Sequence, residues 1–475
     1  MFRLIPKGKI QPKSALDVKS SRLGIGFEKL DRNVFDPEKA YDKMSELGVK
    51  WVRIQSGWAR TETEKGVYHF EWIDSIVDNL IKRGMIPWMC VCYGNGLYDE
   101  KAARRFGGVG CVPVHSEEQK TAWANYCTAL SSHFKGRVKH FEVWNEPDGD
   151  WNIETAETAT TIGEFNIATS KALKKGNPDA FVIGGSFCAT IVKFMNEAMQ
   201  TGMGEHVDAF SFHEYTYNEN SVKQKVSSMR AINRLYGYDL PIIQGESGSQ
   251  SRYGGHGALH TGAWTERKQC KQQLRHLVTD LLCDVMFASY FTCVDMIEAL
   301  NGKVGDKSSY LDYGYFGVLG AEFDENGFSI GEYRRKQSFY TLQNLASLLH
   351  GDVKTVDFPV VFYTRTAAHT GHTPEITCTE ASYGGFELDN GSMAMAYWYP
   401  ANIMTTEYEG SVTLEIAVSG KNPQKYTEIS LVDPMDGTVY AIPESMTESD
   451  GKGGYIFNNL PIRDYPLFLV FGEIN

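Results

Sequence analysis

Short apolar runs alternate with longer amphipathic segments along the first 350 residues of the chain. The runs are rich in β-branched and aromatic residues, as buried strands are, and the segments between them show the apolar spacing of helices. Eight runs fit this description, and they begin at Leu23, Trp51, Met85, His140, Phe181, Asp208, Pro241 and Val285. Because eight strand–helix units in series can close into a barrel, we predict an α/β fold with a (β/α)8 TIM barrel over residues 23–349.

The pattern changes after His350, where short runs with period-two alternation are separated by turn residues. Examples are Met393–Tyr399, Val412–Ile416 and Phe468–Phe471. Such runs predict an all-β sandwich domain over residues 350–475. Its expected role is structural, and glycan binding through Tyr397 or Tyr399 is a second possibility. Residues 1–22 are polar and irregular, and we expect one strand there that can pack on the C-terminal domain.

Composition narrows the functional classes. The net charge is -12 and no basic stripe is present, which argues against nucleic acid as a partner. No apolar run approaches the roughly 18 residues of a membrane span. The N-terminus lacks the apolar region of a signal peptide, and nine cysteines without metal-ligand spacing favour reduced thiols. We therefore expect a cytoplasmic protein, or a secreted or periplasmic one if a signal has been removed.

Two predicted strands each deliver a glutamate at the carboxyl end. The run from His140 ends in Trp144-Asn145-Glu146-Pro147, and the run from Pro241 ends at Glu246. In a parallel barrel these ends lie at one face, where active sites are found. Glycoside hydrolysis needs two facing carboxyls, one to protonate the leaving oxygen and one to meet the anomeric carbon. We therefore predict Glu146 and Glu246 as catalytic residues.

These residues resemble those of the clan A retaining glycoside hydrolases. The sequence around Arg53 and Trp58 is most similar to glycoside hydrolase family 39, which includes β-xylosidases and α-L-iduronidase, and the resemblance covers roughly residues 24–345. It implies that Glu146 is the acid/base, that Glu246 is the nucleophile and that Asn145 binds the sugar 2-hydroxyl. It also implies retention, for which the carboxyl groups should lie about 5–5.5 Å apart.

Strand alternation suggests partners for the two glutamates. Glu142, Trp144 and Glu146 should share one face of their strand, as Gln244 and Glu246 should on theirs. A buried Glu142 needs a partner, and Arg53 is a candidate. The resemblance instead puts Arg53 beside Glu246, and the sequence leaves the two roles open.

A second pair, His213 and Tyr215, should face one way at the sixth strand. The resemblance implies that Tyr215 orients the nucleophile. The alternative is a core histidine with a packing tyrosine.

Several aromatic residues are candidates for sugar stacking. Trp58 and Trp151 fall in predicted loops and can either stack on a sugar or pack internally. At the eighth strand Tyr290 or Phe291 stands where the clan often has a tryptophan. The predicted loop Asn301–Gly331 carries further aromatics and is long enough for a lid or a subsite wall.

A metal site is not expected. His256 and His260 follow Glu246, but paired histidines after the first strand, which a metal-dependent barrel hydrolase would show, are missing. We predict no cofactor and no metal.

The sequence as a whole predicts a retaining glycoside hydrolase, exo-acting and β-xylosidase-like, with a carbohydrate substrate as its partner. Candidate substrate-binding residues are Arg53, Trp58, Asn145, His213, Tyr215 and Tyr290. The alternatives are another β-glycosidase, an iduronidase-like enzyme, a barrel that binds glycans without cleaving them, or a metal-dependent hydrolase.

Overall fold

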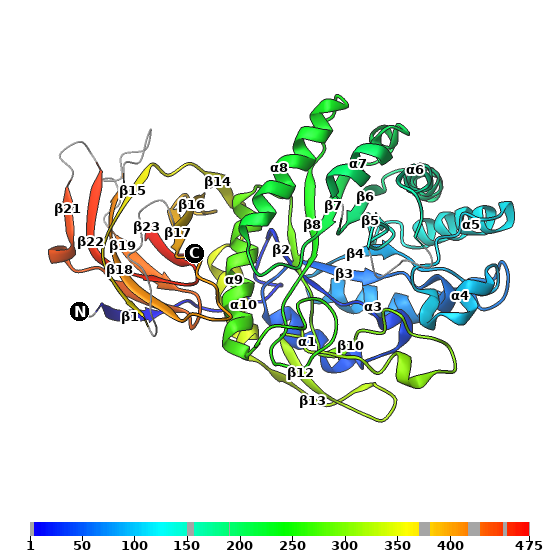
Figure 1. Cartoon of the computed structure of the whole chain (residues 1–475), viewed down its shortest axis with the longest axis horizontal. Helices are drawn as coiled ribbons and strands as arrows, with labels where there is room; N and C mark the ends of the chain where they lie inside the picture. The colour runs from blue at the N-terminus through cyan, green and yellow to red at the C-terminus, as the bar shows by residue number, and fades with distance from the viewer. Residues whose placement is uncertain are drawn as a thin grey trace.

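The computed structural model describes residues 4–149, 156–189, 191–369, 381–416, 428–449 and 454–474. Eight parallel strands form a closed barrel (Figure 1), which confirms the predicted fold. The barrel strands are β2 (Leu23–Gly26), β3 (Trp51–Gln55), β4 (Ile86–Val91), β5 (His140–Val143), β6 (Phe181–Phe187), β7 (Ala209–His213), β8 (Ile242–Ser247) and β9 (Ala288–Tyr290).

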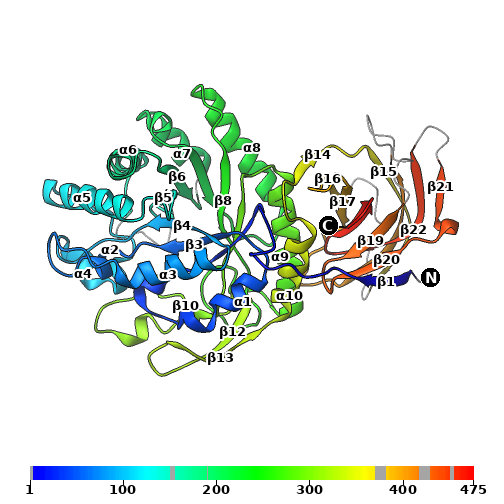
Figure 2. The same ribbon diagram turned by 180° about the vertical axis from the view of Figure 1, so that it is seen from behind.

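Helices cover the outside of the barrel (Figures 1 and 2). They are α1 (Tyr41–Glu46), α2 (Trp58–Thr61), α3 (Glu71–Lys82), α4 (Glu100–Arg104), α5 (Glu117–His133), α6 (Ala159–Gly176), α7 (Ile191–Met199), α8 (Asn220–Leu235), α9 (Glu266–Leu282) and α10 (Gln337–Leu348). Side chains that the sequence contains cap some of these elements. The Ser116 side chain accepts a hydrogen bond from Gln119 N at the start of α5, and Asp36 accepts one from Glu38 N at the 3-10 turn Pro37–Lys39, which precedes α1.

The C-terminal region forms two antiparallel sheets, as predicted for an all-β domain. One sheet has the order β1 (Ile5–Lys9), β20 (Thr438–Ala441), β19 (Ile429–Asp433), β23 (Leu467–Phe471), β17 (Met393–Trp398), β16 (Ser382–Glu387), β14 (Lys354–Val356). The other has the order β15 (Val360–His369), β18 (Tyr408–Ile416), β22 (Tyr455–Arg463), β21 (Thr447–Ser449). The N-terminal segment supplies β1, which pairs with β20 at the sheet edge (Figure 2). Tyr397 is fully buried, so its ring is not a surface for glycans.

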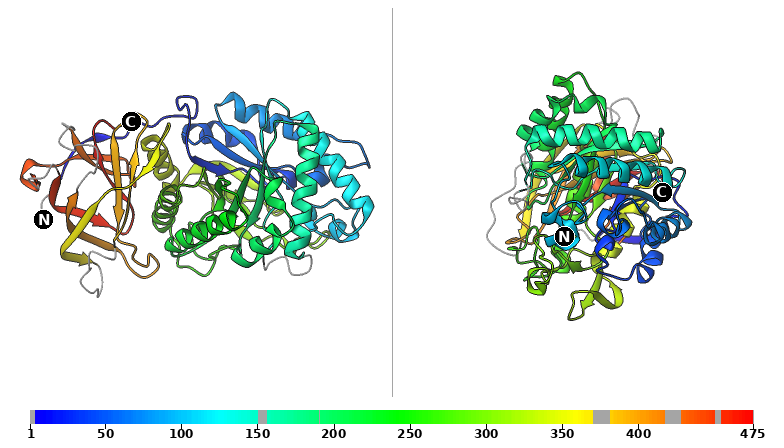
Figure 3. Two further views of the ribbon diagram at one scale, coloured as in Figure 1. Left: turned by 90° about the horizontal axis from the view of Figure 1, so that it is seen from above. Right: turned by 90° about the vertical axis from the view of Figure 1, so that its right-hand side faces the viewer.

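Helices α9 and α10 lie between the barrel and the two sheets (Figures 1 and 3). Buried charged residues make contacts across this boundary. Arg275 on α9 donates to Glu219 at 2.6 Å, and Trp398 of the sandwich donates to the same carboxylate at 2.8 Å. Lys271 contacts Asp464 at 2.7 Å. The contact is therefore a packed interface held by charges that have no access to water.

The segment after β9 differs from the predicted single loop over Asn301–Gly331. It contains the short pair β10 (Met296–Ile297) and β11 (Tyr313–Gly314), and the hairpin β12 (Leu319–Phe323) and β13 (Ser329–Arg335). The loop after β8 is bonded to this segment, because Ser251 N donates to Tyr315 O at 2.9 Å and His256 N donates to Tyr313 O at 2.8 Å. Two adjacent barrel loops therefore form one structured wall.

Apolar side chains fill part of the barrel interior. A separate buried cluster consists of Trp88, Ile183, Ala209, Ile243 and Phe287. These side chains come from β4, β6, β7, β8 and the residue before β9, which is how barrels of this kind are filled. No helix in the described ranges is long and apolar enough to cross a membrane.

Candidate active site

Glu146 lies in a sharp turn after β5. Trp144 and Glu146 have left-handed backbone conformations, with φ of 66° and 50°. Glu146 N donates to both the carbonyl oxygen of Ser186 (3.1 Å) and its hydroxyl (3.0 Å). These bonds from β6 hold a conformation that non-glycine residues rarely adopt, as is common at functional sites.

The same turn makes the predicted alternation wrong at Trp144. Its ring packs against Trp123 of α5 and Phe165 of α6, at centroid distances of 5.8 Å and 5.7 Å, on the outside of the barrel. The left-handed conformation turns this side chain away from the face that Glu142 occupies. Asn145 points to the interior instead, where its side-chain oxygen accepts a hydrogen bond from Arg53 at 2.9 Å.

Glu246 reaches the interior because β8 contains an irregularity. The register between β7 and β8 shifts at this point, so that Phe212 pairs with Gln244 and His213 pairs with Glu246. The prediction that Gln244 and Glu246 share one face is therefore wrong, because a bulge adds one residue between them. That residue is Gly245, where a Cβ atom would lie 3.0 Å from both Glu142 Oε1 and His213 Nε2.

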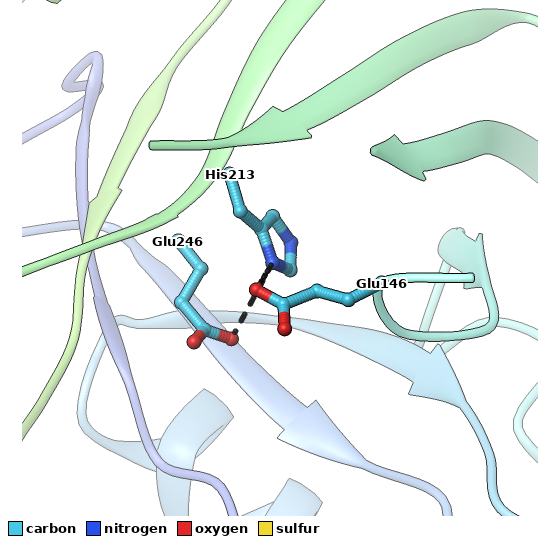
Figure 4. Close-up of side chains that lie close together, drawn as sticks. All are labelled: Glu146, His213 and Glu246. Atoms are coloured by element: carbon cyan, nitrogen blue, oxygen red, sulfur yellow. Dashed lines mark hydrogen bonds and ion pairs between the residues drawn. The ribbon is translucent and has the colours of Figure 1, made fainter. Parts of the chain in front are cut away.

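The two glutamates face each other across His213 (Figure 4). One carboxylate oxygen of Glu146, one of Glu246 and a ring nitrogen of His213 all lie within 4.8 Å of one another. The side chains of Glu146 and Glu246 are 11% and 13% exposed, whereas His213 is fully buried. Solvent, and hence a ligand, can reach the two carboxyls from the mouth while the histidine supports them from below.

Arg53 takes both of the roles that the sequence left open. Its Nε and Nη2 donate to Glu142 Oε2 at 2.9 Å and 2.5 Å, and its Nη1 donates to Glu246 Oε2 at 2.7 Å. Nη2 also reaches Asn145, and Nη1 lies 3.4 Å from Glu28 Oε1. Although burial lowers the pKa of the guanidinium, the acidic neighbours, with Glu142 first, raise it well above its ordinary value. All three nitrogens of the guanidinium donate to carboxylate or amide oxygens, which fixes its orientation.

Tyr215 completes the surroundings of Glu246. Its hydroxyl donates to Glu246 Oε1 at 2.6 Å, so each oxygen of this carboxylate accepts one strong hydrogen bond. Burial and the charge of Glu246 raise the pKa of Tyr215 well above its usual range, so the phenol keeps the proton it donates. Donors on both oxygens favour the ionised form of a carboxyl group.

His213 carries a proton at neutral pH. Burial lowers its pKa, but Glu246, Glu142 and Glu146 outweigh that effect and raise it to about 10. Nδ1 lies 2.9 Å from Glu146 Oε1 and 3.8 Å from Glu246 Oε2. The hydrogen bond between His213 and Glu146 therefore holds a proton beside the glutamate that the resemblance identifies as the acid.

Three charged residues near Glu246 were missed in the sequence. Glu28 and Lys29 follow β2, and Glu298 follows β9, so they lie at the same end of the barrel as the two glutamates. Lys29 Nζ lies 3.2 Å from Glu298 Oε2, and both side chains are buried. Burial raises the pKa of Glu298, Lys29 opposes this, and Asp312 and Glu246 raise it, to about 7 in all. The position of Glu28 and Lys29 just after a predicted strand could have identified these two residues.

Two predicted substrate-binding residues are wrong. Trp58 is not in a loop: it begins α2 and is fully buried against Tyr98, Trp123 and Tyr126. A ring without solvent exposure has no face left for a sugar.

The prediction that Tyr290 binds substrate is also wrong, because this residue is 1% exposed and its hydroxyl donates to Ser249 O at 3.5 Å. Phe291 is the residue that lies near Tyr215, at a ring distance of 6.4 Å. Trp151 lies outside the described residues.

The metal alternative rests on the same three side chains. Among the described residues, Glu146, His213 and Glu246 form the one group of acidic or histidine ligands close enough to hold an ion. His213 Nδ1 is bonded to Glu146 and Arg53 is bonded to Glu246, so hydrogen bonds already engage these ligand atoms. His256 and His260 are not part of the group.

The barrel and its facing glutamates place the protein in the class of glycoside hydrolases. Residues 36–235 match the family model described as Glycosyl hydrolases family 39. The matched range covers less than half of the chain; it includes Arg53 and Glu146 and ends before Glu246. No curated protein sequence matches the chain.

Solved structures show the same fold at low sequence identity. A family 39 glycoside hydrolase from the gut symbiont Bacteroides cellulosilyticus WH2 has a TM-score of 0.60 and 17% identity, with 95% of this chain and 80% of that chain covered. A family 39 β-xylosidase from Caulobacter crescentus has a TM-score of 0.57 and 16% identity, with 99% of each chain covered. A family 30 endoxylanase from Clostridium papyrosolvens C71 has a TM-score of 0.58 and 11% identity, with 98% of each chain covered.

The bulge at Gly245 gives a test of the site geometry. We expect Gly245→Ala to reduce kcat by about 10- to 100-fold, because the new methyl group would push Glu142 and His213 out of place. Gly237→Ala is the matched control, because its added Cβ meets no atom within 4 Å, although the residue has a positive φ. The control should lose some thermal stability and keep its kcat. Equal kcat values for the two variants would show that the close approach at Gly245 has no catalytic role.

Proposed function

We propose that the protein hydrolyses glycosides with retention, through a covalent glycosyl-enzyme on Glu246. The observation that carries this proposal is the short distance between the two carboxyls, whose nearest oxygens lie within 4.8 Å. Inverting enzymes need about 6.5–9.5 Å between the two groups to admit a water molecule, whereas retaining enzymes need about 5–5.5 Å. The separation therefore favours double displacement.

The surroundings of each glutamate support the division of roles. Glu246 accepts hydrogen bonds from Arg53 and Tyr215, which keep it ionised and suit it to attack the anomeric carbon. Glu146 lies opposite Glu246 with its side chain 11% exposed, so it can reach the leaving oxygen of a glycoside bound at the mouth. Asn145, which accepts a hydrogen bond from Arg53, is the candidate partner of the sugar 2-hydroxyl that the clan resemblance implies.

A neutral sugar fits the site better than a uronic acid. Within the described ranges, each cation near Glu246 already has an acidic partner: Arg53 has Glu142 and Glu246, and Lys29 has Glu298. A sugar carboxylate would enter a site rich in glutamates with no spare cation to bind it.

These features make a β-xylosidase-like activity our first proposal. The structurally similar proteins include a β-xylosidase and an endoxylanase. We further propose exo action, because the loop after β8 and the segment after β9 form a structured wall beside the site. Another β-glycosidase acting on a neutral sugar is the second candidate.

Product stereochemistry tests the reaction. We expect the wild-type enzyme to hydrolyse aryl β-xyloside and to release the β-anomer first, as followed by proton NMR during the first minutes. Initial release of the α-anomer would overturn the retaining mechanism. If no neutral or uronic aryl glycoside in a panel is hydrolysed while glycans still bind, the protein is a glycan-binding barrel and the proposed enzyme activity is wrong.

Glu298 provides a prediction about substrate class. We expect Glu298→Gln to leave Lys29 without its acidic partner, so aryl glucuronide or iduronide should gain in kcat/KM relative to the preferred neutral glycoside. The measurement is the ratio of kcat/KM for the neutral and the anionic substrate. A wild-type enzyme that prefers the uronide would contradict the proposed substrate class.

A further inference from the structure

Glu28 is a buried carboxyl that none of the roles above uses. It follows β2, is 1% exposed and lies with Oε1 3.4 Å from Nη1 of Arg53. The same nitrogen donates to Glu246 Oε2 at 2.7 Å. The chain makes room for this side chain with Gly26, where a Cβ atom would lie 2.1 Å from Glu28 Oε2. Glu28 is thus a third carboxyl group in contact with Arg53, the arginine that binds the proposed nucleophile Glu246.

We infer that Glu28 is a positioning residue that competes with Glu246 for Nη1 of Arg53 and thereby sets how readily the Glu246 carboxylate leaves in the second half of the reaction. This inference rests on the double displacement proposed above. Glu28 acts through Arg53 and has no contact with the reacting atoms.

The charge balance at Arg53 explains the competition. Glu142 takes Nε and part of Nη2, which leaves Nη1 as the nitrogen that Glu246 and Glu28 share. In the resting enzyme the shorter bond goes to Glu246, so Glu28 is the weaker partner. When Glu246 becomes an ester it loses its negative charge, and an ionised Glu28 would then be the stronger partner of Nη1. When the ester is hydrolysed, the hydrogen bond from Arg53 to the departing Glu246 carboxylate must form again.

The surroundings of Glu28 allow it to titrate near neutrality. Burial raises its pKa, Arg53 opposes this and Glu246 raises the pKa further, to about 7. The groups that face it are Arg53 from β3, Glu246 from β8, and Thr292 and Cys293 from the segment after β9. Thr292 Oγ1 lies 3.4 Å from Glu28 Oε2 and carries no charge. Burial and Glu28 raise the pKa of Cys293 above its usual range, so the thiol stays neutral.

The expected consequence is a fall in deglycosylation rate as Glu28 ionises. When Glu28 is protonated, Arg53 Nη1 can stabilise the Glu246 carboxylate as it departs. When Glu28 is ionised, it binds Nη1 and weakens this stabilisation. The base, Glu146, works better as pH rises, so its own ionisation cannot produce a fall in this step. The ester removes the charge of Glu246, which raises the pKa of Glu28 in the resting enzyme, so Glu28 ionises at lower pH in the glycosyl-enzyme. A decrease in the hydrolysis of the glycosyl-enzyme with rising pH would therefore report on Glu28.

The test compares wild type with Glu28→Gln on a dinitrophenyl glycoside of the preferred sugar. With this leaving group the second step limits kcat, and acid assistance is not needed. We expect the two kcat values to converge toward the acidic end of the profile, and the variant to be about fivefold faster or more near pH 8.5. Superimposable pH profiles of kcat would overturn the inference.

A matched control and a second measurement complete the test. Glu219→Gln removes another buried Glu–Arg pair, the one with Arg275, and should lower thermal stability without altering the pH profile.

If Glu28→Gln does not fold, a measurement on the wild-type enzyme alone tests the inference. Its glycosyl-enzyme, trapped with a 2-fluoro sugar, should be reactivated more slowly above neutral pH, and a flat or rising reactivation rate would overturn the inference. A wild type that forms no glycosyl-enzyme would refute the proposed function itself, a separate and recognisable outcome.

Discussion

Replacing Glu246 with alanine is expected to lower kcat/KM for aryl glycosides by at least about 10⁴-fold, the largest effect of any single change in this protein. The variant removes the atom that attacks the anomeric carbon and leaves Arg53 and Tyr215 without their shared acceptor. Azide should partly restore activity, because a small anion can enter the space and attack from the same face. The product should be the glycosyl azide with inverted configuration, identified by NMR.

Glu246→Gln is the matched control for this rescue. The amide fills the same volume and cannot attack, so activity should be lost and azide should have no space to act. Glu146→Ala should behave in the opposite way, because azide would replace the base in the second step and give the retained azide from an activated substrate. Inverted azide from Glu146→Ala, or retained azide from Glu246→Ala, would exchange the roles proposed for the two glutamates.

The barrel and the two glutamates could be predicted because they depend on order and topology. Eight strand–helix units fix the fold, and the carboxyl ends of β5 and β8 lie together in any such barrel. Neither inference requires knowledge of a single side-chain direction.

The directions of individual side chains could not be predicted from the sequence. Regular alternation misplaced Trp144, because a left-handed residue interrupts it, and misplaced Gln244, because a bulge at Gly245 adds a residue. Tyr290 and Phe291 are neighbours with opposite surroundings, which composition alone does not distinguish. These local departures from regular geometry aim the functional groups, and they are set by contacts between strands that are distant in sequence.

Arg53 could be named from the sequence, but its two roles could not be reconciled there. The sequence presents Glu142 and Glu246 as competing partners, as if one arginine had one contact. The planar guanidinium has N–H groups in several directions, so one side chain pairs with Glu142 on one edge and with Glu246 on the other. The structural and the catalytic roles are therefore coupled in one residue.

We expect this coupling to appear when Arg53 is changed to lysine. A single ammonium group cannot reach both carboxylates, so kcat should fall by about 100- to 1,000-fold even though the positive charge remains. A change to methionine should in addition lower the free energy of unfolding by about 3–5 kcal/mol, because Glu142 would stay buried without a cation. Arg275→Lys is the control: this arginine is equally buried and paired with Glu219 outside the site, so stability should fall while kcat is kept. Chemical denaturation and steady-state kinetics measure the two effects separately. An Arg53→Lys enzyme with wild-type kcat would show that the positive charge alone, and not the shared hydrogen bonds, supports Glu246.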